Sequence, residues 1–151
     1  LIVVTDFRSM ETPLWYLIGA NLLTIGYLVT QYFFFEIQAP FLDTRLVGSL
    51  IGGVVAWVFF FALVYFSKET WMGWGDVWLG LLGGLVVGFS SVLPMLTLSF
   101  ALGAFYGIGL MLIQGKSLKT EVPFAPFLAF GILSTLFLTK SFPQLFWFFS
   151  W

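Results

Sequence analysis

The sequence predicts an all-α protein, a bundle of about six transmembrane helices, and three observations support this fold class. Hydrophobic residues make up 60% of the 151 residues and charged residues only 9%, against roughly 25% charged residues in soluble domains. The mean hydropathy is +1.04. Long uncharged runs, each close to the roughly 20 residues that cross a bilayer, alternate with short polar links. We therefore expect one domain, residues 1–151, embedded in a lipid bilayer.

The expected helices follow one another along the chain in a simple order. The apolar start, residues 1–4, is expected to be the end of a first helix that is mostly missing from this chain. Further spans are expected at residues 13–35, 46–66, 71–92, 94–113 and 122–139. Pro13 suits the first turn of its helix. The aromatic tail, residues 142–151, is about half a span, and we expect an interfacial segment or a truncated helix there.

The residue types that this chain lacks limit the reactions that it could catalyse. The chain contains no Cys and no His, so disulfides, thiolate metal sites, cysteine nucleophiles and Ser-His pairs are excluded within it. Carboxylates, Lys and Tyr remain as groups that can transfer protons. The net charge of −1 gives no sign of nucleic-acid binding. We therefore expect no metal, no cofactor and no nucleic-acid partner.

Two acids stand at the edges of apolar runs. Asp76 lies in the segment WMGWGDVW, at the start of a long uncharged run, and Asp6 lies in the segment VTDFR. An ionisable group at the edge of a membrane helix is costly and usually has a function. Two carboxylates held close together do not both ionise easily, so one acts as an acid and the other as a base. Such a pair can activate a water and protonate a leaving amide nitrogen, which is peptide hydrolysis.

Glycines surround the second acid. Gly73 and Gly75 remove side chains next to Asp76, loosen the start of the helix and let a substrate backbone come near. Small residues at a four-residue spacing also let membrane helices approach closely. Three runs show this spacing: Asp76, Gly80, Gly84, Gly88; Gly48, Gly52, Ala56; and Ser99, Gly103, Gly107. We therefore expect Asp76 to point into the bundle.

Each acid also has a purely structural explanation. Asp6 could cap the helix at 13–35 or pair with Arg8, and Asp76 could be the N-cap of its own helix. Glu69 is the nearest other carboxylate and is the reserve candidate for a role in the site. The remaining acids lie in the polar links, where we expect them to be solvated: Glu11, Glu36, Asp43 and Glu121.

The distribution of basic residues predicts the orientation. With the expected spans, one side of the membrane receives Arg8, Lys68, Lys116 and Lys119, and the other receives Arg45 and Lys140. The side richer in Lys and Arg is expected to be cytoplasmic. Both Asp6 and Asp76 then lie at cytoplasmic ends of their helices.

Three segments, in order along the chain, resemble the type IV prepilin peptidases. Residues 73–76, GWGD, match the GxGD motif of intramembrane aspartyl proteases. Residues 5–8, TDFR, followed by Pro13, resemble the first-aspartate segment of the prepilin peptidases. Residues 115–128, GKSLKTEVPFAPFL, resemble the basic loop and PFGPFL segment of the same family, with Ala125 in place of the usual Gly. Thr12 stands where an apolar residue is common before the proline.

The resemblance implies a function and a site. Asp6 and Asp76 would be the catalytic pair of an aspartic-type endopeptidase, supported by Gly73 and Gly75. The substrates would be type IV prepilins and pseudopilins, whose short basic leader is cut at the cytoplasmic face of the inner membrane. Possible substrate-binding residues are Glu69, Lys116, Lys119, Phe124 and Pro126. Many members of the family also methylate the new N-terminus through a Cys-rich N-terminal region that is not in this chain, so we expect proteolysis and leave methylation open.

Two other functions remain as alternatives. A transporter or channel subunit could bind a cation or proton at Asp76, but the other expected spans carry no charged residue that would extend a pathway. A non-catalytic membrane scaffold could keep the fold without the activity. The sequence predicts neither the oligomeric state nor the particular pilin.

Overall fold

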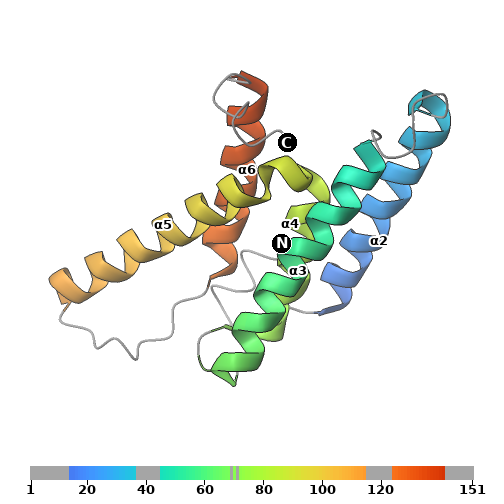
Figure 1. The fold of residues 1–151 in the computed structure, drawn as a ribbon. Helices are drawn as coiled ribbons and strands as arrows, with labels where there is room; N and C mark the ends of the chain where they lie inside the picture. The colour runs from blue at the N-terminus through green and yellow to red at the C-terminus, as the bar shows by residue number, and fades with distance from the viewer. Residues whose placement is uncertain (1–13, 37–44, 69, 71, 115–123, 142–151) are drawn as a thin grey trace.

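The structure, a computed structural model, describes residues 14–36, 45–68, 70, 72–114 and 124–141, and every regular element in them is helical. The elements are α2 (Leu14–Gln31), a π-helical turn η1 (Tyr32–Glu36), α3 (Arg45–Ser67), α4 (Trp74–Val87), α5 (Phe89–Gln114) and α6 (Ala125–Ser141). Figure 1 shows α2, α3 and α4 as one group of neighbouring rods, with α5 and α6 on the other side of α4. The all-α prediction is confirmed; the start at residues 1–4 and the tail at 142–151 lie outside the described residues.

Within the described residues, three helical segments are long and apolar enough to cross a membrane: Leu14–Phe35, Arg45–Ser67 and Phe89–Gly109. By contrast, α4 has 14 residues and α6 has 17. At 1.5 Å per residue α4 is about 21 Å long, which is shorter than the roughly 30 Å of a bilayer core. The expectation of one long span at residues 71–92 was therefore wrong, because the helix begins later and ends earlier.

Gly88 is the reason that α4 ends where it does. Its φ of +78° lies in a region that L side chains rarely adopt, and its N–H donates to the Gly84 carbonyl at 3.0 Å. The next helix begins at Phe89, five residues before the start expected at Pro94, and Pro94 lies inside it. Membrane helices tolerate such a proline because neighbouring groups satisfy the freed backbone. The glycine, and not the proline, separates the two helices.

Replacing Gly88 with Ala is expected to destabilise the bundle through the backbone alone. A methyl group at this position would meet no atom of the described residues within 4 Å, so the effect is the cost of holding a residue with a side chain at a φ of 78° and a ψ of 167°, about 1–3 kcal/mol. The melting temperature in detergent checks this. Gly107→Ala is the matched control, because Gly107 lies within α5 and also has open space around it. Equal melting temperatures for Gly88→Ala and the wild type would contradict the backbone argument.

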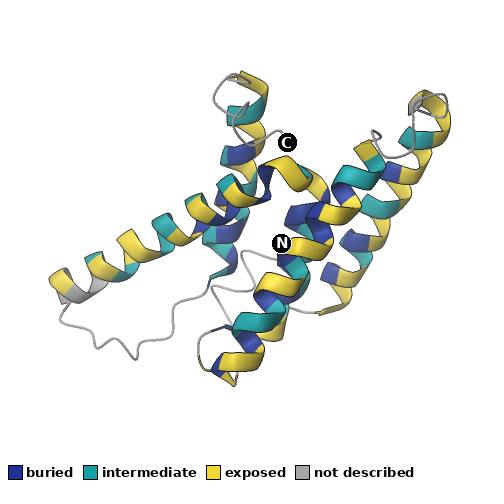
Figure 2. Ribbon diagram, viewed as in Figure 1, coloured by how far each residue is buried: buried dark blue, intermediate teal, exposed yellow. Residues whose placement is uncertain are grey.

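The core lies where α3, α4, α6 and the first half of α5 meet, and Leu17 of α2 also belongs to it. Figure 2 shows the buried segments of these helices in dark blue. Phe60 of α3 is fully buried, and its ring centroid lies 6.2 Å from that of Phe100 and 5.9 Å from that of Phe124. The second half of α5 is mostly exposed, including Phe105 and Leu112. The buried cluster consists of Leu17, Ala56, Phe60, Val64, Met72, Val77, Leu79, Val92, Met95, Leu96, Ala125 and Leu128.

Glycines allow α3 and α4 to touch through their backbones. A methyl group at Gly52 would lie 2.7 Å from the Gly84 carbonyl oxygen, and one at Gly84 would overlap the Gly52 carbonyl. One turn earlier in α4, a methyl group at Gly80 would overlap the ring of Phe60. The predicted small-residue contacts are therefore confirmed for these glycines.

The prediction of close helix contacts holds less well at the ends of the runs of small residues. A methyl group at Gly48 or at Gly107 would have no atom within 4 Å, so neither glycine is needed for a helix contact among the described residues. Ser99 of α5 makes a close helix contact, as expected. A methyl group at Gly131 of α6 would overlap the Ser99 hydroxyl oxygen. Spacing identifies which residues share a face, but not how far along that face a neighbouring helix extends.

Candidate functional site

The GWGD motif forms the start of α4. Gly73 is the N-cap, in an extended conformation, and Asp76 is the third residue of the helix. The Asp76 N–H donates to the Gly73 carbonyl at 3.1 Å, and the Gly73 N–H donates to Asp76 Oδ2 at 3.3 Å. The carboxylate therefore makes one half of a capping box. Asp76 is not the N-cap that the structural alternative proposed, but its side chain does take part in starting the helix.

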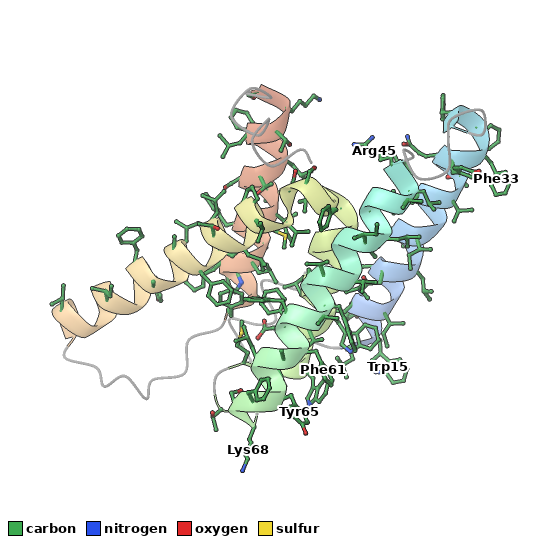
Figure 3. All side chains as sticks on the ribbon, viewed as in Figure 1. Trp15, Phe33, Arg45, Phe61, Tyr65 and Lys68 are labelled. Carbon is green, nitrogen blue, oxygen red and sulfur yellow. The ribbon has the colours of Figure 1, made fainter. Side chains whose placement is uncertain are left out.

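Trp74, the variable residue of the motif, connects the start of α4 to α3. Its ring centroid lies 5.8 Å from that of Phe61. Phe61 belongs to a row of stacked rings along α3, at 5.0 Å from Trp57 and 6.1 Å from Tyr65. Figure 3 shows Phe61 and Tyr65 on the last turns of α3, close to Lys68. These ring contacts hold the motif against α3.

Asp76 is half-buried. Gly80, one turn further on, is buried against Phe60, and Gly84, two turns on, is buried against Gly52. Residues four apart in a helix lie on nearly the same face, so Asp76 shares this inward face. Val77, the next residue, is completely buried. The expectation that Asp76 points toward the bundle agrees with this placement.

Gly73 has no structural need to be glycine among the described residues. Its φ of −90° and ψ of 166° suit any residue. A methyl group there would have only the Gly75 nitrogen nearby, at 4.0 Å. This differs from Gly80 and Gly84, where packing leaves no room. Among the described residues, the motif thus has open space beside Gly73, whose N–H donates to the Asp76 carboxylate.

Four of the predicted site residues, Asp6, Glu69, Lys116 and Lys119, lie outside the described residues. Phe124 and Pro126 are described. The Phe124 carbonyl accepts the N–H groups of Phe127 and Leu128 at 3.0 and 3.1 Å, which starts α6. Its ring centroid lies 4.9 Å from that of Phe100. Phe124 therefore packs the start of α6 onto the core beside Phe60, and Pro126, half-buried, follows in the first turn of α6.

Sequence reasoning missed Asn21. This amide is 4% exposed within α2, and its Nδ2 donates to the Leu17 carbonyl at 2.8 Å and to the Trp78 carbonyl of α4 at 3.2 Å. Trp78 is two residues beyond Asp76. The available signal was an amide in the middle of an uncharged run, since a polar side chain in a membrane helix commonly bonds to a neighbouring helix.

The ends of the helices fall into two groups. α2 and α4 begin at the end of the bundle where α3 ends at Ser67, next to Lys68 (Figures 1 and 3). Arg45, at the start of α3, lies at the opposite end of the bundle, the end at which Phe33 also lies. The chain therefore enters α2 at the same end at which Asp76 lies. Among the described residues, no three His, Cys, Asp or Glu side chains gather where they could hold a metal ion.

Comparison with known proteins gives a consistent set of relatives. A "Prepilin leader peptidase/N-methyltransferase" of Aeromonas hydrophila is 33% identical over 88 residues, which are 58% of this chain and 30% of that protein. The protein of the same name from Pseudomonas putida is 33% identical over 97 residues, 64% of this chain and 33% of that protein. The chain thus matches about a third of the length of these relatives. No solved structure matches.

The family comparison covers most of the chain. The type IV leader peptidase family matches residues 1–108. This range includes Asp6, Asp76 and the glycines of the GWGD motif, and it ends before the segment at 115–128. More than half of the chain is matched, over the helices that form the candidate site and the segment that precedes them. The chain belongs to the type IV leader peptidase family.

Proposed function

We propose that this chain is the proteolytic part of an intramembrane aspartyl endopeptidase, which removes the short basic leader of type IV prepilins or pseudopilins. The family match supports the peptidase activity, and the names of the relatives supply the substrate class. The observation that carries the aspartyl mechanism is the position of Asp76. It lies on the inward face of a short helix that begins at the end of the bundle where α2 also begins.

The proposed catalytic pair is Asp6 and Asp76. Asp6 is eight residues before Leu14, the first residue of α2, so its segment enters α2 at the end of the bundle where α4 begins. α2 and α4 are also in direct contact, through the bond from Asn21 to the Trp78 carbonyl. These facts support the pairing because Asp6 is only eight residues before the start of α2, and α2 begins at the same end of the bundle as the helix that carries Asp76.

The pair would hydrolyse the leader by general acid–base catalysis. One carboxylate takes a proton from a water, whose oxygen attacks the peptide carbonyl, and the other donates its proton to the leaving nitrogen. The C–N bond then breaks, giving a new carboxylate and a new amine. The space at Gly73 suits this reaction, since an extended substrate backbone needs to come within reach of the Asp76 carboxylate.

The cytoplasmic face is the proposed side of cleavage. Lys68 lies at the end of the bundle where α4 begins, and Arg45 lies at the other end. Lys140 is in the last turn of α6, which finishes at the same end as Arg45. The arrangement of these three residues agrees with the predicted count, in which the side of Asp76 also receives Arg8, Lys116 and Lys119. The excess of basic residues favours the cytoplasm for that side.

Co-expression of the full-length protein with a prepilin from the same cell tests the activity. Cleavage is expected to remove the leader and shift the pilin to a lower mass on a gel, with the new N-terminus directly before the hydrophobic helix. The matched control is Asp6→Asn, which keeps the shape of the side chain. A pilin that stays unprocessed with the wild-type enzyme, or is processed equally well with Asp6→Asn, would contradict the proposal.

A further inference from the structure

The buried amide of Asn21 makes a polar contact between α2 and α4. Both of its nitrogen contacts are main-chain carbonyl oxygens, so the hydrogen-bond network requires the nitrogen, and not the oxygen, to face them. One N–H is used within α2, on Leu17, and the other reaches across to Trp78. The amide oxygen is buried and has no hydrogen-bond partner in the part of the chain that the structure describes. A buried acceptor without a partner destabilises the fold. The favourable contribution of the Asn21 amide therefore comes from its two N–H donors.

We propose that Asn21 is a positioning residue for the leader peptidase reaction. Its bond to the Trp78 carbonyl fixes the register of α2 against α4, and with it the level of the segment that carries Asp6 relative to Asp76. This inference rests on the proposed function, because it assumes that these two acids act as a pair. It adds a residue that touches neither the substrate nor the acids.

The hydrogen bond from Asn21 to the Trp78 carbonyl shows how far α2 is shifted along its axis relative to α4. Asn21 is seven residues, or about 10 Å, beyond the start of α2 at Leu14, and Trp78 is four residues, or about 6 Å, beyond the start of α4 at Trp74. Figure 1 shows that both helices begin at the same end of the bundle. The two starts therefore lie within about one helical turn, 5.4 Å, of each other. The start of α2 therefore lies close to the level of the GWGD motif, with which α4 begins.

Apolar contacts alone give this register little specificity. The other buried residues of α2 are Leu17 and Leu28, and lipid tails are as apolar as leucine, so these side chains distinguish weakly between neighbouring registers. A directed bond to one carbonyl does distinguish them. A slip by one turn would move the Asp6 segment by about 5.4 Å, whereas a displacement of about 1 Å at a catalytic group already costs roughly 100-fold in rate.

Leader cleavage by the full-length enzyme tests the proposal through the separate kinetic constants. Asn21→Leu keeps the shape of the side chain without its donors, and it is expected to lower kcat about 10- to 100-fold with little change in KM. Asn21→Gln retains both donors and is expected to be faster than Asn21→Leu. Thr24→Val is the matched control: Thr24 Oγ1 donates only within α2, to the Ala20 carbonyl at 2.9 Å, so its loss is expected to change kcat less than twofold. An Asn21→Leu enzyme as fast as Thr24→Val would overturn the proposal.

A second measurement reports the relative position of the two acids and does not depend on catalytic activity. The chain has no cysteine, so the double variant Asp6→Cys, Asp76→Cys can be cross-linked specifically in a cysteine-free background. The cross-link is expected to form with Asn21 and to fall severalfold with Asn21→Leu. An unchanged yield with Asn21→Leu would overturn the positioning role and leave the acid pair standing. No cross-link even with Asn21 would instead contradict the pairing of the acids, and both proposals with it.

Discussion

Asp76→Asn is expected to abolish leader cleavage while the bundle stays folded. The amide has the shape of the carboxylate and still offers an oxygen to the Gly73 N–H, which the carboxylate accepts at 3.3 Å. It cannot take up or give a proton in the reaction, however. Loss of general acid–base catalysis lowers the rate by about 10²–10⁴-fold. Single-turnover cleavage of a purified prepilin, together with the melting temperature, measures the two effects separately.

Two further variants separate chemistry from structure at this position. Asp76→Ala also loses the acceptor for the Gly73 N–H, so it is expected to be as inactive as Asp76→Asn and less stable, by about 1 kcal/mol. Asp43→Asn removes the same charge from a link between expected spans, and it is expected to leave cleavage unchanged. An Asp76→Asn enzyme that retains a tenth or more of the wild-type rate would leave Asp76 with a structural role only, as part of the capping box.

The sequence was sufficient to predict the helices, because uncharged runs of membrane length have few alternatives to a helix. It was not sufficient to predict the break at Gly88. Gly88 continues the four-residue spacing of Gly80 and Gly84, yet these two are needed for packing, whereas Gly88 is needed for its positive φ. Spacing cannot distinguish these two uses of glycine, and Pro94 offered a more obvious boundary.

The candidate site was predictable in a similar, partial way. The motif identified Asp76 and its glycines, and the small-residue stripe predicted the inward face. Asn21 was missed because a single polar residue makes no pattern, and its importance comes from a contact between residues 57 positions apart in the chain. The pairing of Asp6 with Asp76 stays a prediction, since Asp6 lies outside the described residues.

Gly52→Leu is expected to have the largest effect on stability of any substitution in α3. A side chain there would be directed at backbone, with the Gly84 carbonyl oxygen, the Gly88 carbonyl carbon and the Phe89 nitrogen each 2.7 Å from its first carbon. Backbone atoms cannot rotate away as a side chain can, so α3 and α4 would have to separate. Overpacking of well-packed cores costs about 1–3 kcal/mol and occasionally more, and we expect the upper end of this range.

Gly48→Leu is the matched control, one turn earlier in the same helix, where a methyl group would have no atom within 4 Å. It is expected to melt within a few degrees of the wild type. Because α4 carries Asp76 at its start, the separation caused by Gly52→Leu is also expected to lower leader cleavage in the fraction that stays folded. If both variants melted alike, direct backbone contact would not be what holds α3 and α4 together. The Phe61–Trp74 ring contact and the packing of Phe60 over Gly80 would then have to hold Asp76 against α3.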